Sequence, residues 1–208
     1  MVKIPSKTVE RELFRDGYRS IIAVDEVGMA CLAGPVTVCA VRINPAFIGR
    51  THRQLAWLRD SKLLSPDQRE RYADALMLNS ELSFRVASCS PRTIDRMNIY
   101  QASRHAMRRA IRALMTDAPT MVLVDGNKRI QGIGLEQRPI VGGDRSVFSI
   151  AAASVIAKVH RDRVMERYAR AYPRYGFERH KGYPTAYHRL CLRELGPCPL
   201  HRRSFRLT

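Results

Sequence analysis

The chain has 208 residues, of which 45% are hydrophobic, so it is long enough for a packed core and too apolar for a disordered protein. Its 36 Lys and Arg residues outnumber 19 Asp and Glu, and the formal net charge of +17 favours a polyanionic partner such as nucleic acid. A basic solvated surface would explain the charge equally well. No apolar run approaches the roughly 20 residues of a membrane-spanning helix, and residues 1–7 lack the apolar core of a signal peptide. We therefore expect a monomeric protein of the cytoplasm.

Apolar and β-branched residues gather in short runs between turn-forming residues, which predicts strands. The strands are expected at residues 21–27, 36–43, 83–87, 121–124 and 138–141. Helical spacing of apolar residues and helix-start signals, such as Ser65 followed by Pro66, predict helices between them. The helices are expected at residues 6–14, 65–79, 98–115, 146–171 and 185–195, with a loop at 172–183. This order of elements indicates a mixed α/β sheet.

The five cysteines argue against a disulfide scaffold or a zinc ribbon, because their number is odd and no Cys-x-x-Cys pair occurs. Cys31 and Cys39 lie among apolar residues and are interpreted as small core side chains. His180, His188 and His201 do not have a zinc spacing, so we interpret them as packing or phosphate-contact groups.

Acidic residues follow three of the predicted strands. Asp25 and Glu26 close the first, Asp125 follows the fourth, and Asp144 comes after the fifth and a Gly-Gly pair. Ligand sites in α/β sheets lie at the carboxyl ends of strands, so the four carboxylates are expected to converge. Divalent cations with a preference for oxygen ligands, such as Mg²⁺ and Mn²⁺, are the usual reason for such a cluster. Any one of these acids could instead be an exposed strand end, a turn residue or a helix cap.

Neighbouring strand residues face opposite sides of a sheet, so Asp25 and Glu26 can converge only where the strand ends or bends. Gly28 makes a bend there plausible. An acidic pocket for cations within a basic chain predicts an enzyme that cuts or joins a polyanion.

The ordered motifs of the chain resemble the type 2 ribonuclease H (ribonuclease HII) family. The family pattern DExGRGPLAGPV corresponds to DEVGMACLAGPV at 25–36, and the family's DSKKLS corresponds to DSKLLS at 60–65. Further blocks match in order: VDGN at 124–127, GD at 143–144, SIAAAS at 149–154, AKV and RD between 157 and 162, HKGY at 180–183 and HRRSF at 201–205. One block alone would be weak, whereas the series, over about residues 6–205, is very specific.

The resemblance implies a ribonuclease H-like fold, with a mixed sheet of about five strands flanked by helices and a helical C-terminal region. Residues 1–208 would form one catalytic domain, with about 172–208 as a substrate-contacting extension. The implied activity is cation-dependent hydrolysis of the RNA strand of RNA–DNA hybrids, and cleavage on the 5′ side of single ribonucleotides in duplex DNA. The products would carry 5′-phosphate and 3′-hydroxyl ends, and the role would lie in DNA replication and repair.

By motif position, the catalytic and metal-binding tetrad falls on Asp25, Glu26, Asp125 and Asp144. With substrate bound, two cations (Mg²⁺ or Mn²⁺) about 4 Å apart can activate water and stabilise the leaving oxygen. Asp162 is left out of the tetrad, because charged neighbours on the same helix suit a local ion pair.

Substrate contacts are expected around the tetrad. Tyr183 is the candidate that senses the sugar, because its ring can stack on a nucleotide and its hydroxyl can meet the 2′-OH that distinguishes RNA from DNA. A half-buried loop aromatic is the plain alternative. The other candidates are main-chain, hydroxyl and cationic groups, each of which could instead be part of a solvated surface. They are Gly28, Met29, Ala30, Ser61, Lys62, Lys158, Lys181, Arg202 and Arg203.

One motif departs from the family. The family's Gly-Arg-Gly, a loop that lies against the ribonucleotide, is Gly28-Met29-Ala30 here. Met29 keeps a backbone amide and loses the guanidinium, and Ala30 would be strained by about 1 kcal/mol if its φ were positive. The departure raises the alternative of a catalytically weakened or inactive nucleic-acid-binding relative. Another two-metal nuclease of the same broad fold, such as a resolvase-like or integrase-like enzyme, is a third hypothesis, which the motifs outside the tetrad disfavour.

Overall fold

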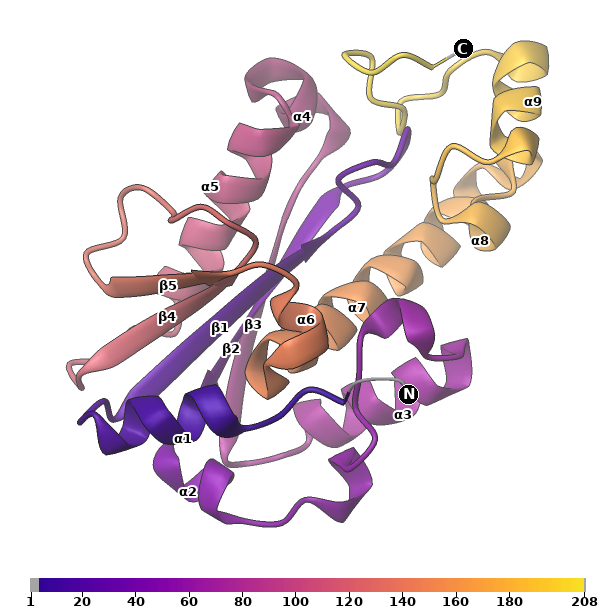
Figure 1. Ribbon diagram of the computed structural model, residues 1–208. Helices are drawn as coiled ribbons and strands as arrows, with labels where there is room; N and C mark the ends of the chain where they lie inside the picture. The colour runs from indigo at the N-terminus through magenta and orange to yellow at the C-terminus, as the bar shows by residue number, and fades with distance from the viewer. Residues whose placement is uncertain (1–3, 208) are drawn as a thin grey trace.

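A five-stranded sheet in the order β3-β2-β1-β4-β5 forms the centre of the computed structural model, which describes residues 4–207 (Figure 1). The strands are β1 (Ser20–Val27), β2 (Val36–Ile43), β3 (Leu82–Cys89), β4 (Thr120–Asp125) and β5 (Glu136–Ile140). The pairs β1–β2 and β2–β3 are antiparallel, whereas β1–β4 and β4–β5 are parallel. The predicted mixed sheet of about five strands is confirmed.

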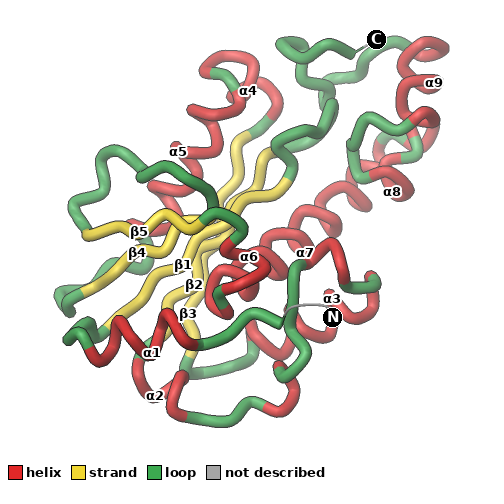
Figure 2. Tube along the Cα trace, viewed as in Figure 1, coloured by secondary structure: helices red, strands yellow, loops and turns green. Residues whose placement is uncertain are grey.

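Helices cover both faces of this sheet, with α7 across one face and α5 across the other (Figure 2). The helices are α1 (Thr8–Arg15), α2 (Pro45–Gly49), α3 (Pro66–Met77), α4 (Pro91–Met97), α5 (Ile99–Arg112), α6 (Gly143–Ser146), α7 (Phe148–Ala171), α8 (Phe177–His180) and α9 (Ala186–Leu195). In the described part of the chain, no helix is both long enough and apolar enough to cross a bilayer.

The alternation of side chains along β1 divides the core in two. Ile21 and Ala23 pack in the core beneath α7, while Ile22 and Val24 pack in the core beneath α5. Continued by two residues, the same alternation directs Asp25 to the α7 side and Glu26 to the α5 side. Asp25 and Glu26 therefore leave the end of β1 on opposite faces of the sheet.

Several short helices differ from the sequence-based expectation. α2 and α4 were not predicted, and α8 lies within the segment 172–183, which was expected to be a loop. Residue 146 ends the one-turn helix α6 instead of beginning the long helix, because Val147 is extended (φ −118°, ψ 123°) and separates α6 from α7. The start of α3 agrees with the prediction, since Ser65 and Gln68 form a reciprocal capping box.

The C-terminal segment packs at the far end of α7, beside the loop that joins β1 to β2 (Figure 1). Three buried histidines hold it together: the rings of His180 and His188 stack at 4.0 Å, and His188 Nε2 lies 3.1 Å from His201 Nε2. Burial lowers the pKa of all three, that of His188 to about 4. The trio is therefore a neutral packing cluster, as one of the two sequence interpretations held. The cysteines are buried free thiols.

Candidate active site

The four acids line one pocket of about 290 Å³ at the carboxyl ends of β1 and β4. The pairing of these two parallel strands ends at Val24 and Val124, so the acids that follow lie where the sheet opens. We call this cavity the acid pocket. Its other walls are the 28–30 turn, Ser61, Lys62, Ser154, Lys158 and Tyr183.

Asp25 and Glu26 reach the acid pocket from the two sides of β1. Both residues still pair with β2, Asp25 with Cys39 and Glu26 with Val38, so the strand is regular through this point. Asp25 is buried, and its Oδ1 accepts a hydrogen bond from the Glu26 backbone N–H at 2.7 Å. Both carboxylates can line the pocket because the pairing of β1 with β4 ends at Val24, just before them, and the chain turns away at Gly28.

Asp125 and Asp144 are tied together through one backbone amide. Asp125 Oδ1 accepts from the Gly143 N–H at 2.8 Å, and Asp144 is the next residue, buried in the single turn of α6. A Cβ at Gly143 would lie 2.5 Å from Ile150 Cδ1 and 3.3 Å from that same carboxylate oxygen. Asp144 does not cap α7, whose N-cap is Val147, so the capping alternative does not describe it.

The electrostatics of the acid pocket favour the uncharged forms of Asp25, Glu26 and Asp144. Burial, followed by repulsion from Glu26 and Asp125, raises the pKa of Asp25 well above its ordinary value. Burial and repulsion from Asp125 raise the pKa of Glu26 to about 7, against an opposing effect of Arg104. Burial likewise raises the pKa of Asp144. A compact group of carboxylates with these pKa values would gain much from a nearby positive charge.

Two fully buried arginines hold the 28–36 loop beside the acids. Arg161 donates to the carbonyls of Pro35 (3.0 Å), Ala33 (3.1 Å) and Lys181 (2.8 Å). Arg202 donates to the carbonyls of Gly34 and Met29, at 3.0 and 3.1 Å. These contacts fix the loop against α7 and against the C-terminal segment.

The 28–31 segment is a turn closed by a 3.4 Å hydrogen bond from the Cys31 N–H to the Gly28 carbonyl. Gly28 has φ +93°, and a Cβ there would lie 2.4 Å from Arg161 Nε, so both conformation and space require glycine. Among residues 4–207, positive φ at non-glycine positions occurs only at Asn98 and Lys181. The φ of Ala30 is therefore not positive, so the backbone strain that a positive φ would cause at this residue does not arise.

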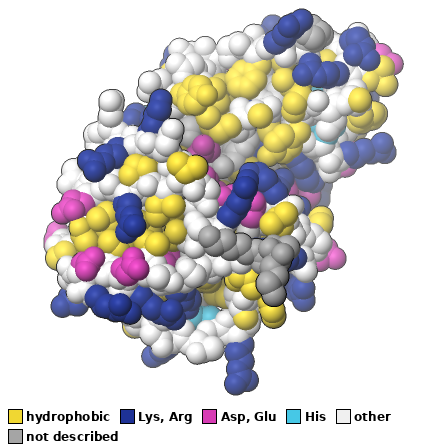
Figure 3. All heavy atoms as spheres, in the orientation of Figure 1, with side chains coloured by type: hydrophobic (Ala, Val, Ile, Leu, Met, Phe, Trp, Pro, Cys, Tyr) yellow, Lys and Arg dark blue, Asp and Glu magenta, His cyan; other side chains and the backbone are white. Residues whose placement is uncertain are grey.

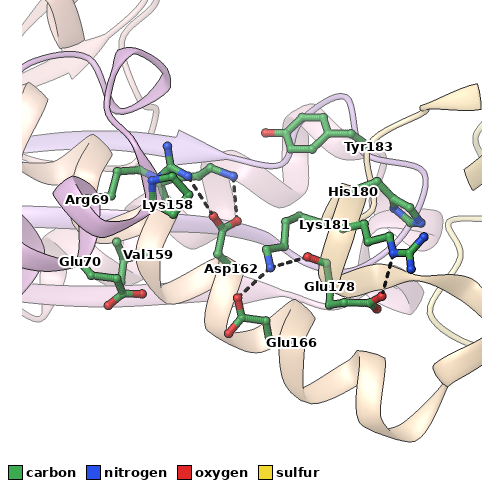
Figure 4. Close-up of a pocket in the computed structure, with 12 residues that line it drawn as sticks. Arg69, Glu70, Lys158, Val159, Asp162, Glu166, Glu178, His180, Lys181 and Tyr183 are labelled. Atoms are coloured by element: carbon green, nitrogen blue, oxygen red, sulfur yellow. Dashed lines mark hydrogen bonds and ion pairs between the residues drawn. The ribbon is translucent and has the colours of Figure 1, made fainter. Parts of the chain in front are cut away.

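Tyr183 stands at the junction of the acid pocket and a neighbouring pocket of about 330 Å³ beside α7 (Figure 4). Lys158 Nζ lies 5.6 Å from the centre of its ring and donates to Asp162 Oδ1 at 2.7 Å. Asp162 also lies 4.0 Å from Arg69, which donates to the carbonyls of Ser61 and Leu64. Asp162 thus forms local ion pairs, as predicted, although its closest partner is Lys158. Burial raises the pKa of Tyr183 to about 12, so its hydroxyl keeps its proton.

The other predicted cations are distributed differently. Lys62 is exposed at the rim of the acid pocket, and the buried hydroxyl of Ser61 lies 3.2 Å from that of Ser154. Lys181 is outside the acid pocket and pairs with Glu166 at 2.7 Å. Arg203 is exposed and does not line the pocket.

Arg202 requires a correction. It was expected to contact phosphate, yet its side chain is fully buried and bound to loop carbonyls. It is a positioning residue for the loop. On the face that Figure 3 shows, Lys and Arg side chains are scattered, with acidic groups between them.

Sequence reasoning overlooked two residues of this region. Arg161 is one of the charged neighbours of Asp162 on the same helix, and only the fold, in which its side chain is fully buried, identifies it as a structural anchor. Ser154 was noted only within a small-residue motif, yet it lines the acid pocket. No pattern in the sequence separates it from Ser149, which is also buried.

A family model described as Ribonuclease HII matches residues 22–208. The chain belongs to the ribonuclease HII family. It is 46% identical over 190 residues to the ribonuclease HII of Chlorobium chlorochromatii, covering 91% of each chain. It is 44% identical to that of Rhizobium meliloti, covering 98% of this chain and 90% of the relative. Membership of the ribonuclease HII family makes the chain a type 2 ribonuclease H enzyme.

Solved structures agree with this assignment. The ribonuclease H2 of Pyrococcus horikoshii matches with a TM-score of 0.73 at 25% identity, covering 90% of this chain and 94% of that one. Ribonuclease HII of Archaeoglobus fulgidus, solved in a complex with PCNA, matches with a TM-score of 0.73 at 26% identity, covering 90% and 96%. Bst-RNase HIII, solved with Mn²⁺, has the same fold at 19% identity, with a TM-score of 0.67 and coverage of 92% and 68%. The expected ribonuclease H-like fold is confirmed.

Proposed function

We propose that this type 2 ribonuclease H uses Asp25, Glu26, Asp125 and Asp144 to hydrolyse RNA in RNA–DNA hybrids with the help of divalent cations. We propose further that it cuts on the 5′ side of single ribonucleotides in duplex DNA, leaving 5′-phosphate and 3′-hydroxyl ends. The observation that carries the proposal is the meeting of the four carboxylates in one pocket, which the 28–30 turn and Tyr183 also line.

The donor set fits Mg²⁺ or Mn²⁺. All four side chains offer hard oxygen ligands. Burial and mutual repulsion raise the pKa values of Asp25 and Glu26, and a bound cation would offset the free-energy cost of holding both carboxylates in their charged form. Within residues 4–207, no three or more acidic, His or Cys side chains are arranged so that they could hold a metal ion by themselves, so a cation here would need further ligands. An open arrangement suits Mg²⁺, which keeps several waters and takes ligands from substrate phosphates. When bound, such cations would supply activation of water and stabilisation of the leaving oxygen.

Recognition of the ribonucleotide is assigned to the 28–30 turn and to Tyr183. The backbone N–H groups of Met29 and Ala30 have no acceptor within the described residues, and both residues line the acid pocket. They can therefore donate to a sugar hydroxyl, and the protonated hydroxyl of Tyr183 is a further donor. The replacement of the family's arginine by Met29 leaves these main-chain donors in place, which argues against an inactive relative.

Three labelled duplexes test the proposal: one with a single ribonucleotide, one full hybrid and one of DNA alone. We expect cleavage of the first two with Mg²⁺ or Mn²⁺, and none with a chelator. Asp125→Asn should abolish cleavage and leave binding equal or tighter, because a negative charge beside phosphate is removed. Asp117→Asn, at an exposed acid outside the pocket, is the matched control. Near-normal cleavage by Asp125→Asn would refute the assignment of the tetrad.

A further inference from the structure

A second cavity, of about 490 Å³, adjoins the acid pocket on the α5 side of the sheet. We call it the α5 pocket. The two cavities share Glu26, Met29 and Asp125, so they meet at the ends of β1 and β4. A substrate strand that is bound at the four acids can therefore continue into the α5 pocket.

The walls of the α5 pocket carry groups that suit a nucleotide. Tyr100, in the first turn of α5, is 69% exposed, which leaves its ring available for stacking. Arg104 follows one helical turn later, and Lys128 lies in the loop after β4. Gln101 and Asn127 add exposed amides. An aromatic platform with nearby cations is the common arrangement for binding single nucleic-acid strands.

The two cations are suitably placed for a polyanion. The Arg104 guanidinium donates to the Arg129 carbonyl at 2.7 Å and forms no ion pair among residues 4–207, although it lies near enough to Glu26 to oppose the rise in the pKa of that acid. Lys128 is exposed, and no ion pair or hydrogen bond engages its ammonium group within residues 4–207. In the pocket beside α7, by contrast, Lys158 pairs with Asp162 and Lys181 with Glu166. Within the described residues, the cations that line the pocket beside α7 all belong to ion pairs, whereas Arg104 and Lys128 of the α5 pocket do not.

We propose that the α5 pocket binds a nucleotide of the substrate that flanks the cleaved linkage. Its base leaves the stack of the duplex and packs on the ring of Tyr100, and its phosphate lies against Arg104 and Lys128. Met29 forms the partition between this nucleotide and the ribonucleotide at the acids. The inference rests on the proposed function, because the nucleotide belongs to the same substrate strand.

Binding is measured with a chelator present, so that cleavage does not interfere, on a DNA duplex that contains one ribonucleotide. Tyr100→Ala should weaken affinity by about 5- to 100-fold, which is the usual effect of losing one base–aromatic stack. Tyr100→Phe keeps the ring and should bind like the wild type. Trp57→Ala is the matched control, since Trp57 is equally exposed (69%) and lies outside the pocket. Lys128→Ala should reduce the slope of log affinity against log salt by about one.

A second measurement needs no variant. Duplexes with 2-aminopurine at single positions on either side of the ribonucleotide should show a change in fluorescence at one flank when the wild-type enzyme binds, because the base there exchanges its neighbours in the duplex for the Tyr100 ring, and Tyr100→Ala should abolish the change. Unchanged affinity in Tyr100→Ala and Lys128→Ala, with equal fluorescence at every flanking position, would overturn the assignment of the α5 pocket. If the wild type still cleaves normally with metal, this outcome would leave the proposed function intact. Absence of wild-type cleavage with metal would instead refute the proposed function.

Discussion

Glu26→Gln should stabilise the metal-free protein at alkaline pH while abolishing cleavage. The pKa of Glu26 is raised from an ordinary value of 4.5 to about 7, mainly by burial and then by repulsion from Asp125. The folded chain therefore binds a proton at Glu26 more tightly than the unfolded chain does. The contribution of this group to stability is full below about pH 4.5 and is lost as the pH rises to about 7.

The size of the effect follows from the two pKa values. At about 1.4 kcal/mol per unit, the gap between 4.5 and about 7 corresponds to about 3 kcal/mol at pH 8. Glutamine carries no charge, so the variant avoids this cost. The difference between variant and wild type should fall below about 0.5 kcal/mol at pH 4.5, where the wild-type side chain is protonated in the folded chain and about half protonated in the unfolded chain.

Urea unfolding with a chelator, at pH 8 and at pH 4.5, measures these free energies. Added Mg²⁺ should stabilise the wild type at pH 8 more than it stabilises the variant, because a ligand of the folded state raises stability by mass action. Glu12→Gln, at an exposed position on α1, is the control and should change little. A Glu26→Gln protein that is no more stable than the wild type at pH 8, or equally more stable at both pH values, would refute the reasoning.

Three other substitutions test the supports of the site. Gly143→Ala places a Cβ 2.5 Å from Ile150 Cδ1, so we expect loss of cleavage and a lower melting temperature; Gly134→Ala, where the new Cβ meets nothing within 4 Å, should be silent in both assays. Arg161→Met removes three buried charged hydrogen bonds and should cost about 3–5 kcal/mol in urea unfolding, and a loss under 1 kcal/mol would contradict the anchor role. Met29→Arg should raise cleavage at a lone ribonucleotide more than cleavage of a continuous hybrid, and equal changes on both substrates would show that this side chain does not read the junction.

Much of the fold could be predicted from local chemistry. The strand positions follow from β-branched runs, and Ser65-Pro66 correctly indicates the start of α3. The same signal, a capping residue before proline, occurs at Asn44-Pro45 and Ser90-Pro91, where α2 and α4 begin. Those two helices were therefore predictable and were overlooked because they are short.

Other parts of the site could not be read from the sequence. The arrangement of Asp144 depends on a long-range contact, from the Gly143 amide to Asp125, which no local pattern encodes. The burial of Arg202 depends on the docking of the C-terminal segment against the 28–36 loop, so its motif position suggested a phosphate contact. The strain at Ala30 depends on its φ angle, which is set by the folded backbone and not by a local sequence pattern.

The turn at 28–31 has a consequence for how the enzyme can change through evolution. Its carbonyls at Gly28 and Met29 accept hydrogen bonds from within the protein, while the amides of Met29 and Ala30 are left as donors. Any residue except proline supplies such an amide, so side chains at positions 29 and 30 can vary without removing the donors. Gly28 has no such latitude. We expect a saturation library of this turn to tolerate many residues at 29 and 30, to reject proline at both, and to retain only glycine at 28.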